Sequence, residues 1–298
     1  MRGGRGVGTA APTITLDVGP LAVGEAAGGT VFGRIVQTEP PPEGEPFRDE
    51  FGLDQTVRER LLPAFRFLHD RYWRVEVTGI ENLPANGPAV VVANHSGALP
   101  FDGAMICTAA EIRRGRTVRF LYDRFVENLP PVASFYRKMG GAVAARENAV
   151  RLLRAGYPVL LFPEGVSGVA KSFNDRYRLR PFSPGFARLA LSLDVPVVPV
   201  AVVGAEEIYP MVGRAEGVGR LLGMPYLPLT PFFPMLGLLG TLPLPTKWFI
   251  RFGKPIRLSA IDVEARFQRA RHEALHVRRI IQQMVTRLRR RRQSVFFG

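Results

Sequence analysis

Cysteine and histidine are both scarce in this chain, with one and four residues respectively among 298. The lone cysteine, Cys107, excludes an internal disulfide framework and indicates a reducing compartment. It lies in an apolar stretch, where packing is its expected role. Cysteine and histidine nowhere cluster with the spacing of a metal site, so we expect no bound metal. The stretch Met1 to Gly29 lacks the continuous apolar core of a secretory signal, and we expect no signal peptide.

Acidic residues are absent after Glu273, whereas seven arginines fall in that region and carry half of the net charge of +14. They are Arg278, Arg279, Arg287, Arg289, Arg290, Arg291 and Arg292. Such a run suits nucleic acid, an anionic membrane surface or anionic substrates. The alternative is a solvated helix end that the helix dipole favours. Stacking aromatics do not interleave with these arginines, so we expect an anionic membrane surface as partner and no nucleic acid.

The two ends of the chain differ in character from its middle. Residues 1–50 are rich in glycine, proline and alanine, and we expect them to be disordered or poorly ordered. An amphipathic helix is predicted next, because apolar residues recur at three-to-four spacing. They are Leu53, Val57, Leu61, Phe65, Leu68 and Tyr72. Residues 262–292 predict a long basic helix with one apolar face. We therefore predict one folded domain over residues 51–298.

Short apolar, β-branched runs alternate with helical stretches between residues 74 and 203. The runs are 74–79, 88–93, 117–122, 142–145, 157–162 and 195–203. The helical stretches lie near 103–114, 131–139, 147–155 and 184–193. This rhythm predicts an α/β fold, a single domain with a central, largely parallel β-sheet flanked by helices. The last run contains Pro196 and Pro199, which favour an edge or bulged position for that strand.

The segment from Leu221 to Thr246 has no charged residue and is long enough to span a bilayer. Six prolines interrupt it, and each would remove a helical hydrogen bond that is costly to lose in lipid. We therefore predict an interfacial or re-entrant apolar segment over 221–246. An apolar loop packed on the domain is the alternative.

A candidate catalytic pair follows the second apolar run. Asn94 and His95 close that run, Ser96 comes next, and Asp102 stands at the predicted start of a helix. Imidazole is the natural general base at neutral pH, and a carboxylate can fix its tautomer and stabilise its charged form. The alternative is a core histidine bonded to backbone, since a lone His-Asp pair is a weak signal.

Two further segments place polar groups after apolar runs. A short run that starts at Gly141 ends at Arg146, whose guanidinium suits bidentate binding of phosphate, although alone it is equally a surface charge. Residues 162–165 turn another run sharply and carry Glu164 at the bend, where a plain turn is the alternative. Ligands gather where the strands of such sheets end, so we expect His95, Arg146 and Glu164 to share one rim.

In this order, these segments resemble the glycerolipid acyltransferase family, which includes glycerol-3-phosphate and lysophosphatidate acyltransferases. The family motifs are Asn-His followed by Asp, then Gly-x-x-x-x-Arg, then Phe-Pro-Glu-Gly, then a Val-Pro-Val-Val-Pro-like strand. Here they are Asn94-His95 with Asp102, Gly141 with Arg146, Phe162 to Gly165, and Val195 to Val200. The resemblance covers about residues 75–205, with weaker agreement over 247–255. Four short motifs in the same order make a specific signal.

One departure concerns the loop between His95 and Asp102. The family places four residues between these two positions, whereas this sequence has six. Either Asp102 reaches His95 through a longer loop bent at Pro100, or it only caps a helix that begins at Gly103. The resemblance favours the catalytic role. The variant loop leaves the acceptor open.

The resemblance implies transfer of a fatty acyl group from an acyl thioester, acyl-CoA or acyl-ACP, to a hydroxyl of a glycerolipid. The first candidate acceptor is 1-acylglycerol-3-phosphate, in phospholipid biosynthesis. The implied catalytic residues are His95 and Asp102. The implied acceptor and phosphate-binding residues are Arg146, Glu164 and Gly165. The implied supporting residues are Asn94, Ser96, Gly141, Phe162 and Pro163. No cofactor beyond the thioester co-substrate is implied. The nearby Lys171, Arg176 and Arg178 could assist, but we expect them on a solvated loop.

Lipid substrates also imply a peripheral or monotopic protein at the cytoplasmic face of a membrane. Two other functions stay open. The first is the same chemistry on a neutral or other lyso-lipid acceptor such as diacylglycerol, for which Arg146 would be dispensable. The second is a non-catalytic lipid-binding protein. A serine hydrolase is not expected, because no Gly-x-Ser-x-Gly elbow occurs.

Overall fold

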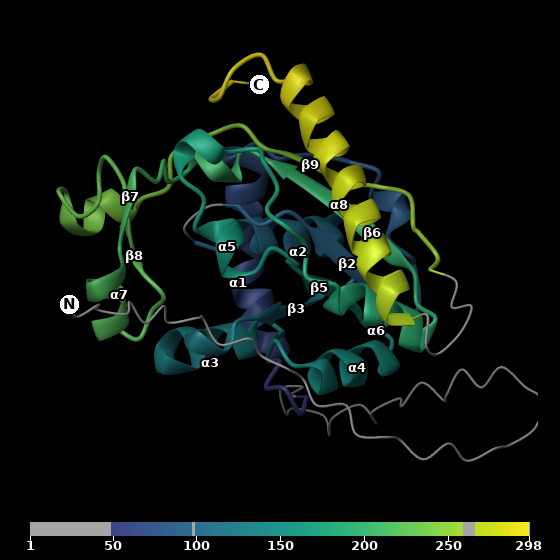
Figure 1. The fold of residues 1–298 in the computed structure, drawn as a ribbon. Coiled ribbons are helices and arrows are strands. Elements are labelled where there is room, and N and C mark those ends of the chain that lie inside the picture. The colour runs from purple at the N-terminus through teal and green to yellow at the C-terminus, as the bar shows by residue number, and fades with distance from the viewer. Residues whose placement is uncertain (1–48, 97–98, 259–265, 298) are drawn as a thin grey trace, which may run out of the picture. The chain divides into compact units, whose positions relative to one another are not determined.

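The computed structural model describes residues 49–96, 99–258 and 266–297 (Figure 1). The predicted disorder of residues 1–50 falls almost entirely outside the described residues, as does the predicted start of the C-terminal helix at 262. Within the described part, one seven-stranded sheet lies between helices on its two faces, which confirms the predicted single α/β domain.

The sheet is largely parallel, as predicted. Its strands are β1 (Glu76–Thr78), β2 (Ala89–Ala93), β3 (Arg119–Tyr122), β4 (Gly141–Val143), β5 (Pro158–Leu161), β6 (Val197–Val203) and β9 (Phe249–Phe252). They are ordered β1-β9-β6-β2-β5-β3-β4, and the β6–β9 pair alone among these neighbours is antiparallel. All six predicted runs form strands. Strand β9, which follows the uncharged segment, was not predicted.

The predicted helices also form, with boundaries shifted by a few residues. The longer ones are α1 (Gln55–Phe67), which continues as the π-helical turn η1 (Leu68–Tyr72), then α2 (Phe101–Arg114), α3 (Pro130–Lys138), α4 (Arg146–Arg154), α6 (Gly185–Leu193) and α8 (Arg266–Arg291). The short ones are α5 (Val166–Val169), α7 (Glu216–Leu221), η2 (Ile80–Asn82), η3 (Arg124–Asn128), η4 (Phe173–Asp175), η5 (Ala205–Glu207) and η6 (Gly237–Thr241). A separate two-stranded hairpin pairs β7 (Gly213–Ala215) with β8 (Leu227–Leu229).

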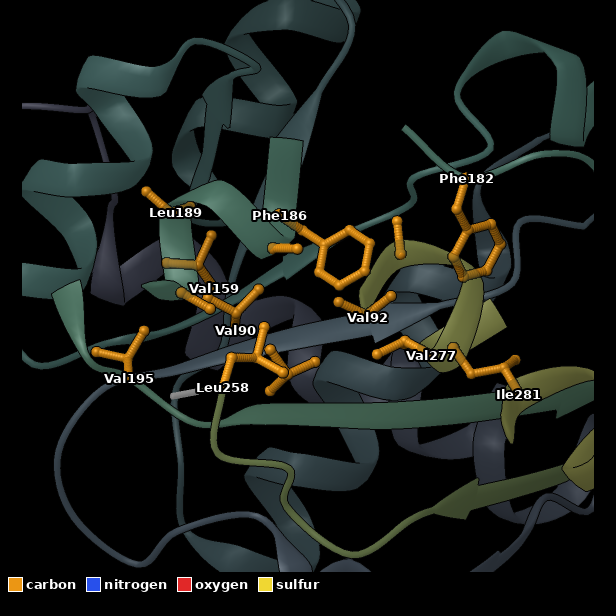
Figure 2. Close-up of a cluster of buried hydrophobic side chains, with 14 of the residues drawn as sticks. Val90, Val92, Val159, Phe182, Phe186, Leu189, Val195, Leu258, Val277 and Ile281 are labelled. Carbon is orange, nitrogen blue, oxygen red and sulfur yellow. The ribbon is translucent and has the colours of Figure 1, made fainter. Parts of the chain in front are cut away.

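Strand β2 is buried on both faces, which explains why its sequence is a continuous apolar run. Its alternate residues belong to two separate cores. Val90 and Val92 pack with Val277 and Ile281 of α8 and with residues of α4 and α6, in the core that Figure 2 shows. The other β2 residues pack on the opposite face, beneath η1 and α2.

Strand β6 lies in the middle of the sheet, so the predicted edge position is wrong, whereas the predicted irregularity is present. Its ladder with β9 pairs Val200 with Phe252, but a further bridge pairs Val197 with Ile256. Two residues of β6 therefore lie opposite three residues of the other segment, as in a β-bulge. Pro199 lies at this bulge, where the regular hydrogen-bond ladder is already interrupted, so its missing N–H costs no ladder hydrogen bond.

The C-terminal arginine run is only partly solvated. The Arg292 side chain is 4% exposed, and its Nη1 lies 2.7 Å from Oε1 of the buried Glu207. Arg278 donates to the backbone oxygens of Leu179 and Arg180. These two arginines anchor α8 to the domain, so they do not belong to a free basic surface.

The uncharged segment folds as short elements and turns, in agreement with its prolines. Among the described residues, no helix is both long enough and apolar enough to cross a membrane.

Candidate active site

The candidate site lies where neighbouring parallel strands end. Strands β6, β2 and β5 are adjacent and parallel, so their carboxyl ends meet at one edge of the sheet. His95 follows β2, Phe162 and Glu164 follow β5, and Glu206 follows β6. Sheet topology therefore brings these four residues together.

His95 and Asp102 form a hydrogen-bonded dyad. Nδ1 of His95 lies 2.7 Å from Oδ2 of Asp102, and the Asp102 side chain is fully buried. A carboxylate only accepts, so Nδ1 carries the proton and Nε2 is the ring nitrogen that can accept one. The imidazole is 15% exposed and lines a large cavity, so it is not a sealed core histidine.

Despite the six residues between them, Asp102 reaches His95, and its carboxylate also accepts hydrogen bonds from two backbone N–H groups. Its Oδ2 also accepts from the backbone N–H of Ser96 at 2.8 Å, and its Oδ1 accepts from that of Gly103 at 2.7 Å. Helix α2 begins at Phe101, with Pro100 at the N-cap, so the predicted start at Gly103 is wrong. Asp102 lies in the first turn, where the helix dipole favours a negative charge. The contact with His95 therefore forms despite the longer loop.

Asn94 fastens the end of β2 to β6. Its Nδ2 donates to the oxygen of Val202 at 3.0 Å, and its Oδ1 accepts from the Val202 N–H at 2.8 Å. The buried Asn94 side chain thus makes the pair of hydrogen bonds that a further backbone residue of β2 would make. This clamp fixes the backbone immediately before His95.

Phe162 and Pro163 support the dyad from β5. The Phe162 ring is stacked on the imidazole, with centroids 4.0 Å apart and planes 17° from parallel. The oxygen of Pro163 accepts from the N–H of Ser183 at 2.9 Å, which ties the turn to the segment before α6. The imidazole is therefore held on its face as well as at Nδ1.

Glu164 does not face the cavity, so the prediction that it contacts the acceptor is wrong. Its side chain has no exposure. Oε1 accepts from the backbone N–H of His95 at 2.9 Å, and Oε2 accepts from that of Arg180 at 2.7 Å. Both oxygens are occupied by the protein itself, because the sharp turn after β5 points the carboxylate back beneath the dyad. Glu164 is a positioning residue in this geometry.

Lys171 was expected on a solvated loop, and that expectation is wrong. Its side chain is 3% exposed, and Nζ lies 2.8 Å from Oε1 of Glu206 and 3.4 Å from Oε2 of Glu164. Burial lowers the pKa of Lys171, but the two carboxylates outweigh it and raise the pKa above its ordinary value. Burial also raises the pKa of Glu206, against the effect of Lys171. No local sequence signal marks this cluster, since its members are brought together only by β5 and β6.

Three glycines at the site are needed for different reasons, two of them a close approach of neighbouring atoms and one a positive φ. A Cβ on Gly168 would lie 2.9 Å from Cβ of His95, and one on Gly141 would lie 2.6 Å from the Phe120 ring. Gly165 lines the cavity with φ +56°, a conformation that favours glycine. Gly141 therefore serves packing against Phe120. The sequence did not predict a role for Gly168.

The cavity beside His95 has a volume of about 530 Å³ and mostly apolar walls. One wall is a face of α2, since the lining residues recur at helical spacing. They are Gly103, Ala104, Cys107, Thr108 and Glu111. At 1.5 Å per residue this wall extends for about 12 Å from the dyad. Its far end holds the ion pair of Arg58 and Glu111, 2.7 Å apart.

Arg146 does not share this cavity. Of the three residues predicted to share one rim, His95 lines the cavity, whereas Glu164 and Arg146 do not. Phe162 and Gly165, on either side of Glu164, line it instead. Arg146 is exposed at the start of α4, and Ala144 is the nearby residue that lines the cavity. Strand β4, which precedes it, is separated from β2 by β5 and β3. Three strand spacings place β4 about 14 Å from β2.

The fold and the site thus combine an α/β sheet with an imidazole–carboxylate dyad that lines an apolar cavity. Residues 74–203 match the protein family described as Acyltransferase. The chain belongs to the glycerolipid acyltransferase family, as its motifs predicted.

Several known proteins resemble this chain. It is 45% identical over 260 residues to uncharacterized protein ML2427 of Mycobacterium leprae, covering 84% of this chain and 70% of that protein. It is 30% identical over 171 residues to the DGAT1/2-independent enzyme synthesizing storage lipids of Homo sapiens, covering 57% of this chain and 51% of that protein. The chain thus spans about half the length of this human relative.

A solved structure shares the fold. The crystal structure of the 1-acyl-sn-glycerophosphate (LPA) acyltransferase PlsC from Thermotoga maritima has a TM-score of 0.52 and covers 83% of this chain and 86% of its own. Sequence identity is 20%, so this likeness concerns the fold alone.

Proposed function

We propose that this chain transfers a fatty acyl group from an acyl thioester to a hydroxyl of a glycerolipid, with His95 as general base. The observation that carries the proposal is the His95–Asp102 dyad at the wall of an apolar cavity large enough for an acyl chain. Family membership supports the reaction type.

Each residue of the dyad has a defined part in the reaction. Nε2 of His95 takes the proton of the acceptor hydroxyl as its oxygen attacks the thioester carbonyl carbon. The tetrahedral intermediate then collapses, the C–S bond breaks, and the imidazolium returns the proton to the leaving thiolate. Asp102 keeps the productive tautomer and stabilises the imidazolium. The products are an ester and a free thiol, and no covalent enzyme intermediate is needed because a thioester is already activated.

The acyl chain occupies the apolar cavity in this proposal. The wall formed by α2 gives it about 12 Å of path. The ion pair of Arg58 and Glu111 closes that path, because an alkyl chain would have to desolvate two charges to pass.

The geometry favours an acceptor without a phosphate. Among the described residues that line the cavity, Arg58 is the one Lys or Arg, and it is already paired with Glu111. Arg146, the predicted phosphate ligand, lies outside the cavity. The human relative is named for the synthesis of storage lipids, which points the same way. We therefore favour a neutral glycerolipid such as diacylglycerol, with 1-acylglycerol-3-phosphate as the second candidate that the family supports.

Substituting Arg146→Ala separates these acceptors. We expect acylation of diacylglycerol to stay within about two-fold of wild type, because an exposed side chain outside the cavity contributes little there. The measurement is the initial rate of radiolabelled acyl transfer from acyl-CoA to each lipid in turn. Faster use of 1-acylglycerol-3-phosphate than of diacylglycerol by wild type, together with a loss of about ten-fold or more in the variant, would establish the phosphate acceptor instead.

Lipid substrates also place the protein at a membrane surface in this proposal, peripherally bound at its cytoplasmic face. The exposed arginines at the end of α8, Arg287 and Arg289 to Arg291, could meet anionic headgroups at about 1 kcal/mol each. Arg292 is excluded from this role by its buried ion pair.

A further inference from the structure

A projection of the chain between β6 and β9 has its apolar residues on the outside. We define the hairpin segment as residues 212–242, which contain β7, α7, β8 and η6. In Figure 1 it is the green segment that carries these β-strand labels. It is not part of the seven-stranded sheet.

Burial in the hairpin segment is inverted relative to a water-facing hairpin. Nine of the 17 large apolar side chains that are exposed in the described part of the chain lie in this segment. They are Val212, Val218, Leu221, Leu222, Phe232, Met235, Leu236, Leu239 and Leu242. Among the described side chains between Met211 and Trp248, no large apolar one is buried. A loop packed on the domain would bury such residues, so these exposed side chains favour an interfacial segment.

The segment is nevertheless folded, with its backbone groups bonded to one another. Strand β7 pairs with β8, and the hydroxyl oxygen of Thr230 accepts from the N–H groups of Phe232 and Phe233. A Cβ on Gly240 would lie 2.3 Å from the oxygen of Phe232, which shows how closely the two turns pack. Internally bonded backbone under an apolar exterior is what an apolar solvent requires.

The hairpin segment lies next to the catalytic cavity. The Nδ2 of Asn128 is 3.4 Å from the oxygen of Gly223, and Asn128 ends η3. Phe125 of the same turn lines the cavity. Two other cavity residues, Leu99 and Phe135, are themselves exposed by 43% and 39%. The hairpin segment is therefore linked to a turn that lines the cavity, and the cavity itself has exposed apolar residues.

Charge on the segment suits an anionic lipid surface. Residues 221–246 carry no charge, and the charged residues of the segment are the exposed Arg214 and Arg220, with Glu216 as the one acid. A surface of apolar side chains whose net charge is positive suits hydrocarbon beneath anionic headgroups. A protein partner would be expected to make hydrogen bonds across an interface, and this surface offers few polar side chains for them.

We infer that the hairpin segment inserts into the hydrocarbon boundary of an anionic bilayer and sets the mouth of the catalytic cavity on it. The acceptor and the acylated product then exchange with the bilayer without crossing water. This assignment rests on the proposed function for its purpose, but the insertion itself requires no catalysis.

Tryptophan quenching tests the insertion directly. The two native tryptophans, Trp73 and Trp248, are fully buried, so they provide a constant background. A Leu239→Trp variant should lose about half of its added fluorescence with vesicles of brominated phosphatidylcholine and phosphatidylglycerol, as expected for an indole within the acyl region. A matched Leu275→Trp variant, on α8 at a site 50% exposed, should lose none. Equal signals from the two variants would overturn the inference.

Vesicle sedimentation supplies the second arm. A triple variant changes the three most exposed large apolar residues of the hairpin segment, with Leu221→Ser, Met235→Ser and Leu239→Ser. This variant should bind these vesicles about 100-fold more weakly than wild type. Leu275→Ser is the control and should bind as wild type does. The triple variant should keep its acyl transfer to a short-chain diacylglycerol dissolved as monomers, which also shows that it is folded.

Two results would overturn the inference, and both differ from a failure of the proposed function. The first is unchanged sedimentation of the triple variant. The second is a wild-type dimer, by light scattering, that the triple variant converts to a monomer without any vesicle binding, which would assign the surface to a second copy of the chain. Quenching of the Leu239→Trp variant, in a protein that acylates no lipid, would instead remove the proposed function and keep the insertion.

Discussion

His95→Ala should lower kcat for acyl transfer by about 10²–10⁴-fold, because the proton of the acceptor hydroxyl then has no positioned base. KM for the thioester should change little, since the acyl chain is bound by the cavity walls. Backbone N–H groups, including the one that donates to Glu164, are unaffected by the change. The measurement is the steady-state rate of thiol release from acyl-CoA in the presence of diacylglycerol.

A matched control uses another histidine of the chain. His272 is 66% exposed on α8, far along the chain from the motifs, and His272→Ala should retain wild-type kcat. The kcat of Asp102→Asn should lie between those of His95→Ala and His272→Ala, because an amide can still hold the ring but does not stabilise the imidazolium. If His95→Ala kept wild-type turnover, the assigned base would be wrong.

Lys171→Met should lower the free energy of unfolding by about 3–5 kcal/mol, because it leaves the buried carboxylates of Glu206 and Glu164 without their cation. It should also lower kcat, since Glu164 holds the backbone of His95. Urea unfolding and kinetics of the same preparation measure the two effects. Lys171→Arg, which keeps the charge, should recover part of both.

The pH dependence separates this charge effect from a simple packing defect. Burial raises the pKa of Glu206, and Lys171 opposes that rise. Without Lys171, the native cluster holds a proton that the unfolded carboxyl, with its ordinary pKa of 4.5, has released. The native state then binds more protons than the unfolded state, so the variant should gain stability as the pH falls toward 4.5.

An exposed lysine serves as the control for this series. Lys254→Met should change the free energy of unfolding by no more than about 0.5 kcal/mol at any pH in the series. A Lys171→Met protein whose stability loss is the same at every pH would show that Glu206 and Glu164 stay ionised without the lysine, and would contradict the linkage.

Much of the catalytic dyad could be predicted from the sequence, because its two members lie seven positions apart on a strand end and the following helix. The buried cluster of charged residues beneath the dyad could not be predicted from the sequence. Glu164, Lys171 and Glu206 come from loops after two strands that are separated by β2 in the sheet, and nothing in their spacing indicates contact. Lys171 in particular has the local composition of a surface loop.

The alternation of apolar runs and helical stretches determined the order of elements and the parallel sheet, since periodicity is a local property that the neighbours along the chain express by themselves. The direction in which a side chain points and the depth at which it is buried are not local properties. Only the tertiary structure decided that Glu164 points inward and that β4 carries Arg146 away from His95. It also decided that the apolar residues after Met211 face outward, because burial depends on which distant elements cover a side chain.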